Sequence, residues 1–169
     1  MANRKVISVL SGIATVAVAL VIGGCGDGEI EDFTAISSAP DPNSVDTGTP
    51  GPSLGDYEVF HVTVTKDGKP FGDLYGSKLA VAEPPVKGAP GKDLGLFQNQ
   101  LTFVLADGTI SIAGVQYFTT DGTIPKYSEN GGEYRSIVGG TGAYAGATGV
   151  LHSTARPDGT RIQEFDFDD

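Results

Sequence analysis

The feature that most constrains the fold is a glycine-rich stretch, Ile137–Val150, which reads Ile-Val-Gly-Gly-Thr-Gly-Ala-Tyr-Ala-Gly-Ala-Thr-Gly-Val. A β-branched run leads into a double glycine, and a strand-like pattern resumes after one aromatic residue. Glycine adopts positive φ angles and lets two backbones approach closely, so this spacing suits a tight corner with bulges between two strands. We therefore expect structural roles at this corner for Gly139, Gly140, Gly142, Tyr144 and Gly149.

The same stretch contains Gly140-x-Gly142-x-x-Ala145, a pattern also found in phosphate-binding loops of dinucleotide-binding folds. Such a loop must open a helix inside a βαβ unit. Here Gly146 and Gly149 stand where that helix would begin, and only 27 residues follow Gly142. That length is too short for the rest of a doubly wound sheet, so the pattern favours a corner between strands.

The first 24 residues have the pattern of a secretory signal, with a basic start, an apolar run at Val6–Ile22 and two glycines before Cys25. The segment Ile22–Cys25 resembles a bacterial lipobox, in which the cysteine is acylated. The alternative is an uncleaved membrane helix, because Val6–Gly24 is just long enough to span a bilayer. Cys25 is the only cysteine and has no disulfide partner in the chain. We therefore expect an extracytoplasmic lipoprotein, anchored to a bacterial cell membrane through Cys25.

The charge of the chain excludes one class of partner. The net charge is −10, and removal of the first 24 residues takes away two of 11 bases and none of 21 acids, which gives −12. Such acidity argues against nucleic-acid binding and against electrostatic attachment to anionic lipid. Membrane attachment would then depend on the acyl chains alone.

Residues 25–55 have the composition of a linker. Gly26–Gly55 contains four prolines and six acidic residues but no base. This composition does not support a core, so we expect a flexible acidic tether that reaches roughly 30 Å. Within this tether we expect at most a short ordered segment, in which Phe33 and Ile36 pack locally. One domain, residues 56–169, remains after the signal and the tether.

From Asp56 the sequence alternates with a period of two, as in Phe60, Val62 and Val64, and Asp-Gly pairs separate the alternating segments. Lys69–Glu83 is expected to form one or two short strands, because Gly72 and Gly76 interrupt it. The other expected strands are Tyr57–Thr65, Leu94–Leu105, Ile110–Phe118, Glu133–Val138, Gly149–Ala155 and Thr160–Phe167. Seven or eight short strands without a helical period indicate an all-β barrel or sandwich.

Two of these segments resemble a known family. Leu101–Gly114, followed by Ser136–Gly149, is similar to the allene oxide cyclase and dirigent barrel superfamily. In that superfamily a strand, an Asp-Gly-type turn and a second strand precede a glycine corner of this kind. The resemblance implies an eight-stranded antiparallel β-barrel with a central apolar cavity. It also implies relatives that steer cyclisation or coupling of small hydrophobic molecules, often as homodimers or homotrimers, with polyketide cyclases among the bacterial members.

The sequence departs from the family at positions that matter for chemistry. Dirigent proteins tend to carry arginine where this chain has Ala145 and Thr148, and plant cyclases tend to carry an acid at the first of these positions. Gly146-Ala147 is nearer to the cyclases. The resemblance therefore implies a structural role for the glycines and the aromatic residue of the corner, and it assigns no catalytic residue in this chain.

Candidate catalytic residues come instead from polar positions on apolar strand faces. Glu58 is in phase with Phe60, Asn99 lies between Phe97 and Leu101, and Gln116 precedes Phe118. If these faces point inward, a carboxyl and two amides converge in the cavity, where burial of Glu58 would raise its pKa and suit it to acid–base work. The alternative places each residue near a strand end, in water or bonded to a loop.

We expect no metal and no cofactor. His61 and His152 alternate with threonine, which favours solvent-facing positions, and a metal would need three or four converging ligands. The acidic residues that alternate with Phe165 and Phe167 are typical of a solvated face rather than a calcium site.

Two functional classes stay open. One is a cofactor-independent cyclase, isomerase or stereochemical guide for a small hydrophobic molecule. The other is a non-catalytic barrel of the cell envelope that binds a lipid or a protein. A ligand-sized cavity that contains Glu58 favours the first class, and a barrel filled by its own side chains favours the second.

Overall fold

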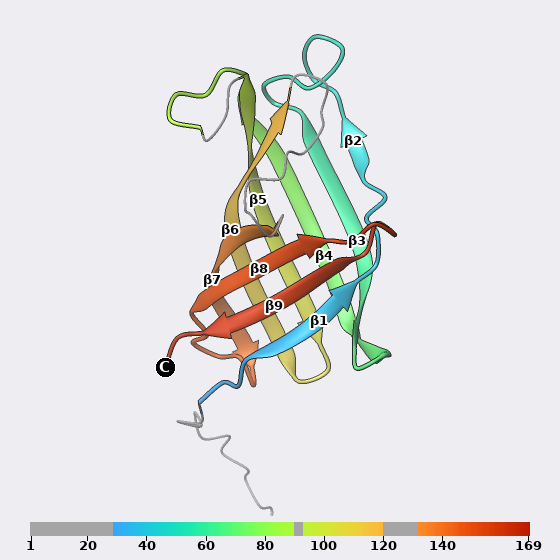
Figure 1. Ribbon diagram of the computed structural model, residues 1–169, viewed down its shortest axis with the longest axis vertical. Coiled ribbons are helices and arrows are strands. Elements are labelled where there is room, and N and C mark those ends of the chain that lie inside the picture. The colour runs from blue at the N-terminus through green and yellow to red at the C-terminus, as the bar shows by residue number, and fades with distance from the viewer. Residues whose placement is uncertain (1–28, 90–92, 120–131) are drawn as a thin grey trace, which may run out of the picture.

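The computed structural model describes residues 29–89, 93–119 and 132–169, and these residues form an all-β structure (Figure 1). The strands are β1 (Phe33–Ser37), β2 (Asn43–Val45), β3 (Tyr57–Lys66), β4 (Lys69–Ala82), β5 (Leu94–Leu105), β6 (Gly108–Thr119), β7 (Gly132–Gly142), β8 (Gly149–Ala155) and β9 (Arg161–Phe167). In these three ranges no helix is long and apolar enough to cross a membrane. The predicted signal segment and Cys25 lie outside the described residues.

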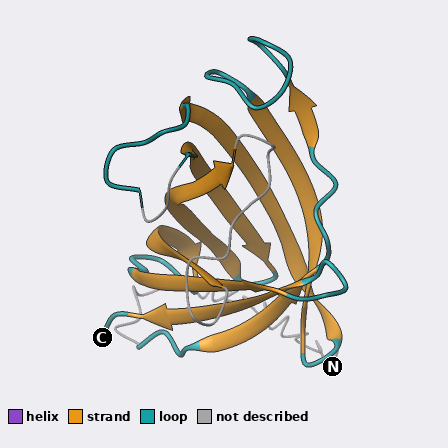
Figure 2. Ribbon diagram, turned by 45° about the horizontal axis from the view of Figure 1, so that its top comes forward, coloured by secondary structure: helices purple, strands orange, loops and turns teal. Residues whose placement is uncertain are grey.

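The strands form a closed antiparallel barrel. From β3 to β9 each strand pairs with the next one in the chain. β1 pairs with β9, where Phe33 lies opposite Phe165, and also with β3, where Ile36 lies opposite Thr65. These two pairings close a barrel of eight strands, while β2 is an additional short strand on β3. Figure 2 shows the strands curving around a common interior. The predicted eight-stranded antiparallel barrel is confirmed.

The prediction of a flexible tether is wrong for Phe33–Ser37. These residues form β1 and supply the strand that joins β3 to β9. Ala35 and Ser37 point into the barrel and are each 1% exposed. The composition of the whole segment did not indicate this strand, because only five alternating residues form it. These five residues are nevertheless enough to close the barrel and to pair two sheet edges that would otherwise be exposed.

Strand β4 also differs from expectation. It runs unbroken from Lys69 to Ala82 through Gly72 and Gly76. A Cβ at Gly76 would collide with the ring of Phe60, and a Cβ at Gly72 would collide with the backbone of β5. The two glycines therefore make room for neighbouring groups, and they do not end the strand.

The inner face of the barrel carries two apolar clusters. The larger cluster contains Ala35, Val62, Val64, Leu74, Leu101, Phe103, Leu105, Ile110, Ile112, Ile137, Tyr144, Ala147, Leu151, Phe165 and Phe167. The smaller cluster contains Ala80, Phe97 and Phe118. The inward positions of Val62 and Val64 confirm the predicted face of the first long strand. On β5 the inward residues run from Phe97 in the small cluster to Leu105 in the large one, so the clusters occupy different depths of the lumen.

The glycine corner lies where β7 turns toward β8. Gly142 has a φ of 64° and is the last residue of β7. Gly139 lies near the same end of β7, and Gly149 is the first residue of β8. The backbone N–H of Ala143 donates to the carbonyl oxygen of Asp107 at 2.9 Å, which fixes the corner to the turn between β5 and β6.

Of the two reasons expected for glycine at this corner, positive φ and close approach of backbones, only the second applies to Gly140. This residue does not have a positive φ. A Cβ at Gly140 would instead collide with the carbonyl oxygens of Thr109 and Tyr144. The constraint is therefore close approach of backbones. Tyr144 is buried in the large cluster, and its ring lies 6.3 Å from that of Phe167, centroid to centroid.

Candidate functional site

A layer of polar side chains crosses the lumen between the two apolar clusters. We call this set the polar layer; it consists of Ser37, Asn99, Gln116, Glu133, Arg135, Ser153, Arg161 and Gln163. Its members come from β1 and from β5 to β9, where each occupies an inward position of its strand. On β5 the order is Phe97, Asn99 and Leu101, so a single strand passes from the small cluster through the polar layer into the large cluster.

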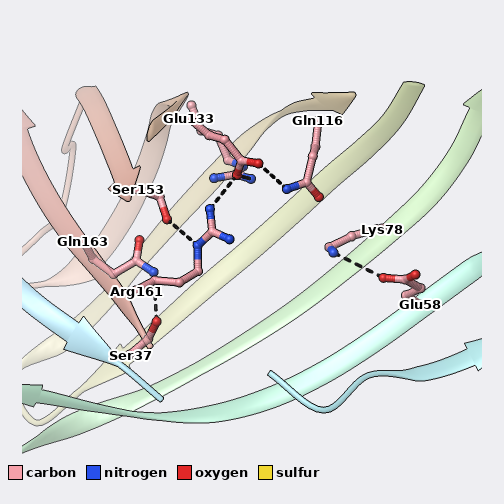
Figure 3. A network of polar contacts seen from close by, with 9 residues as sticks. Ser37, Glu58, Lys78, Gln116, Glu133, Ser153, Arg161 and Gln163 are labelled. Carbon is pink, nitrogen blue, oxygen red and sulfur yellow. Dashed lines mark hydrogen bonds and ion pairs between the residues drawn. The ribbon is translucent and has the colours of Figure 1, made fainter. Parts of the chain in front are cut away.

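Glu133 is the centre of the polar layer (Figure 3). Gln116 Nε2 donates a hydrogen bond to Glu133 Oε1. Both Arg135 Nη2 and Arg161 Nη2 donate to Glu133 Oε2, the latter at 2.9 Å. Burial raises the pKa of Glu133, but the charges of the two arginines and the bond from Gln116 outweigh it, so the pKa lies below its ordinary value. Glu133 is therefore a carboxylate at neutral pH.

The C-terminal strand adds the next bonds. Arg161 Nε donates to Ser153 Oγ at 3.0 Å, and Gln163 Nε2 donates to Ser37 Oγ at 3.0 Å. Burial and the nearby charge of Arg135 lower the pKa of Arg161, against the opposing effect of Glu133. A guanidinium keeps its proton in proteins, so both arginines are cations.

Several polar atoms in this layer have no hydrogen-bond partner among the described residues. Asn99 is 1% exposed, and neither its Nδ2 nor its Oδ1 is bonded. The other such atoms in the layer are Gln116 Oε1, Arg135 Nε and Gln163 Oε1. Buried polar groups are almost always hydrogen-bonded, and a missing partner costs about 1–3 kcal/mol. Unbonded donors and acceptors gathered in one layer are suited to hold a polar group that enters from outside.

One hollow adjoins these atoms, and a second hollow lies next to it. The inner cavity has a volume of about 40 Å³, and its lining includes Asn99, Gln116, Arg135 and Arg161. A second hollow of about 220 Å³, which we call the mouth pocket, is lined in part by residues of β2, by Glu58 and by Phe97.

Lys78 lines both hollows and so lies between them. Its Nζ contacts Glu58 Oε2 at 3.2 Å and lies 5.7 Å and 5.9 Å from the ring centroids of Phe60 and Phe97. The aliphatic stem and the cation–aromatic contacts hold this side chain at the boundary between the mouth pocket and the inner cavity.

The structure separates the three predicted site residues. Asn99 and Gln116 both line the inner cavity. Glu58 lies in the mouth pocket, where it pairs with Lys78 and does not meet the two amides. The expected convergence of all three is therefore wrong for Glu58, because Lys78 on β4 lies opposite both Glu58 and Asn99 and so stands between them.

The sequence reasoning missed the charged members of the polar layer. Glu133 and Arg135 are in phase with inward Ile137, and Arg161 is in phase with inward Phe165. The alternation that identified Asn99 and Gln116 would have found them too. The sequence alone does not favour inward positions for these residues, because charged side chains seldom lie on an inner face.

Both histidines lie outside the lumen. His61 Nε2 is 2.8 Å from Asp73 Oδ1, and His152 Nδ1 is 2.7 Å from Glu164 Oε2. The described residues contain no group of three or more His, Cys, Asp or Glu side chains placed to hold a metal ion.

Comparisons with known proteins identify the fold. No protein-family model and no curated protein matches the sequence. Among solved structures, a pyocyanin demethylase has a TM-score of 0.63 and 25% identity, over 82% of this chain and 100% of that protein. A Diels-Alderase from Streptomyces koyangensis has a TM-score of 0.56 and 14% identity, over 82% and 68% of the two chains.

A third solved structure extends the comparison to the dirigent proteins. A pterocarpan synthase dirigent protein has a TM-score of 0.52 and 19% identity, over 81% of this chain and 82% of that one. The closed antiparallel barrel, the glycine corner and these three likenesses agree with the resemblance seen in the sequence. The chain therefore has the barrel fold of these three structures, one of which is a dirigent protein.

Proposed function

We propose that the barrel binds a small, largely apolar molecule in its lumen and promotes a cofactor-independent cyclisation or isomerisation. The observation that carries the proposal is a polar layer with unbonded donors and acceptors inside an otherwise apolar lumen. Ligand sites combine apolar walls with a few placed polar groups in this way. The similar structures are named for a demethylase, a Diels-Alderase and a pterocarpan synthase, which supports small-molecule chemistry.

In this proposal the polar layer works by positioning and by electrostatic stabilisation. Glu133 accepts bonds from three side chains, so it acts as a fixed anchor and not as the base. It orients Gln116, whose Oε1 stays free to accept a bond from the ligand, and Asn99 offers one donor and one acceptor beside it. Groups that are held in place before the ligand enters lower a barrier without reorganisation in the transition state.

The second candidate is a barrel that binds a ligand without changing it. The inner cavity of about 40 Å³ favours this candidate, because it admits only a small group while the rest of a ligand stays in the mouth pocket. A binding protein needs no more than that arrangement.

Binding is tested with the neutral fluorescent probe N-phenyl-1-naphthylamine. We expect saturable binding that Asn99→Leu weakens, because leucine fills the cavity beside the polar layer. Gln98→Leu is the matched control, since Gln98 lies one residue away on the exposed face of β5. Equal affinity in both variants, or no binding by the unmodified protein, would contradict the proposal.

The two candidates differ in turnover. Cyclisation and isomerisation conserve mass, so an enzyme of this kind converts one compound into another of the same mass. Incubation of the protein with an extract of small molecules, followed by liquid chromatography and mass spectrometry, should show a peak that moves in retention time at constant mass. Loss of that change in the Asn99→Leu variant would assign it to the lumen, and a persistent absence would favour the binding protein.

We also propose that the protein is an extracytoplasmic lipoprotein anchored through Cys25. The lipobox-like Ile22–Cys25 supports this. Cys25→Ser should release the protein or leave its precursor uncut, and mass spectrometry of membrane-bound protein with an unmodified Cys25 would contradict the anchor. The family resemblance further suggests a homodimer or homotrimer, which sedimentation velocity tests.

A further inference from the structure

The charges of the lumen do not balance. Arg135 and Arg161 share the single carboxylate of Glu133. Among the described residues no aspartate or glutamate lines the inner cavity, and the Lys78 cation at its boundary is already paired with Glu58. The chain as a whole has a net charge of −10, yet this buried layer holds one positive charge more than it holds negative charges.

Burial makes this excess charge unfavourable for the empty protein. The side chain of Arg135 is 5% exposed and that of Arg161 is 22% exposed. Removing an ion from water costs several kcal/mol unless a counter-charge and hydrogen bonds replace the water. Glu133 supplies that replacement for only one of the two guanidinium groups.

The unbonded donors lie beside the excess charge. Arg135 Nε and Asn99 Nδ2 have no acceptor among the described residues, and both side chains line the inner cavity. An anionic oxygen placed there would accept charge-assisted hydrogen bonds, which are about twice as strong as neutral ones. The cavity of about 40 Å³ is large enough for a group of a few heavy atoms, since a single water needs about 10–15 Å³ by the same measure.

We infer that the lumen selects an apolar organic acid, whose carboxylate binds between Arg135, Arg161 and Asn99 while its apolar body extends past Lys78 into the mouth pocket. This inference rests on the proposed binding of a small apolar molecule and adds the charge of its polar end. The volume of the mouth pocket, about 220 Å³, and the ring of Phe97 on its wall suit the apolar body. The pocket also contains three carboxylates, and each is already bonded: Asp46 and Asp56 accept from backbone N–H groups, and Glu58 pairs with Lys78. The carboxylate would cancel the unbalanced charge, and Arg135 Nε and Asn99 Nδ2 would gain acceptors.

The test uses three probes of one shape and different charge: 2-naphthoate, its methyl ester and 2-naphthylmethylammonium. Isothermal titration calorimetry measures the affinity of the purified protein for each. One hydrogen bond to a charged group contributes about 1.5–3 kcal/mol, so we expect naphthoate to bind about 10 to 100 times more tightly than the ester. The ammonium probe should bind most weakly.

Arginine variants show where the preference comes from. Arg135→Gln removes the excess charge and should lower the naphthoate affinity about tenfold, while the ester affinity should fall much less. Arg156→Gln makes the same substitution at an exposed residue of the loop before β9 and should change neither. A naphthoate preference that survives in Arg135→Gln would overturn the inference, because the charge in the lumen would not be its source.

The outcomes separate this inference from the proposed function. Equal affinity for naphthoate and its ester, or tighter binding of the ammonium probe, overturns the inference and leaves the proposed function standing. Failure of every probe to bind overturns both. If Arg135→Gln does not fold, the unmodified protein still decides the question: its unfolding midpoint should rise in sodium benzoate relative to sodium chloride of equal concentration, and equal midpoints would overturn the inference.

Discussion

Truncation of Phe33 tests whether β1 closes the barrel. The Phe33 ring stacks on that of Phe165 with 4.4 Å between centroids and meets the edge of Phe71 at 5.4 Å. Lys66 Nζ lies 4.7 Å from the same ring centroid. Phe33→Ala removes these contacts but leaves the backbone pairing of β1 in place, so it isolates the packing contribution of the strand.

The expected loss of stability follows from the burial of Phe33. Complete burial makes Phe→Ala cost about 3–5 kcal/mol, and Phe33 is only partly buried, so lost burial accounts for about 2 kcal/mol. Loss of the stacked pair with Phe165 adds about 0.5–1.5 kcal/mol. The sum is about 3 kcal/mol, which for a chain of this size lowers the unfolding midpoint by about 6–12 °C.

Val45→Ala is the matched control. Val45 also lies in the segment expected to be a tether, but it belongs to β2 and is 56% exposed. Its truncation should change the free energy of unfolding by less than about 0.5 kcal/mol. Urea denaturation followed by circular dichroism measures both variants. Free energies of unfolding that agree within about 0.5 kcal/mol would refute the packing of β1 against the barrel core through Phe33.

Three further changes test other parts of the structure. Because the pKa of Glu133 is lowered in the folded protein, its contribution to stability is complete above the ordinary value of 4.5 and is lost as the pH falls through the folded pKa. In an acid titration of stability, Glu133→Gln should therefore make the loss below about pH 4.5 shallower, and an unchanged slope would contradict the buried ion pairs. Gly140→Val should lower the free energy of unfolding by more than about 2 kcal/mol in thermal unfolding, because the added side chain meets two backbone carbonyls. Ala145→Ser, at an exposed position, should leave the free energy of unfolding almost unchanged, and equal effects of the two substitutions would make the corner an ordinary loop. Asn99→Leu should raise stability by about 1–3 kcal/mol in urea denaturation while it weakens ligand binding, because an unbonded buried amide is removed; a loss of stability would mean that Asn99 is bonded in solution.

Most of the barrel was predictable because its signals are local. Alternation places Leu94–Leu105 with the bounds of β5, and an Asp-Gly turn follows it at Asp107. β1 was not predictable in the same way. Its five residues stand in a proline-rich acidic segment, and their partners on β9 are more than 100 residues away, as in the pair of Phe33 and Phe165. Closure of a barrel depends on such distant pairings, which leave little trace in a short window of sequence.

The candidate site was predictable only in part, for a similar reason. Asn99 and Gln116 each stand out as polar residues between apolar neighbours on one strand. Arg135 and Arg161 obey the same alternation, but a charge on an inner face is credible only when its partner is known. That partner, Glu133, lies on β7 between the strands that carry the other members, and its role depends on the register of β6, β7 and β9 in the closed barrel.

The glycine corner lies apart from the residues proposed to bind a ligand. The corner residue Tyr144 belongs to the large apolar cluster, and no corner glycine lines the inner cavity or the mouth pocket. Stability is thus concentrated at one end, where Phe165 and Phe167 pack with Phe33. That packing offsets the unbalanced charge and the unbonded amides of the polar layer, which lies between the two clusters and on its own opposes folding. Under the proposed function a ligand completes the polar layer, and the glycine corner then serves the fold and not the chemistry.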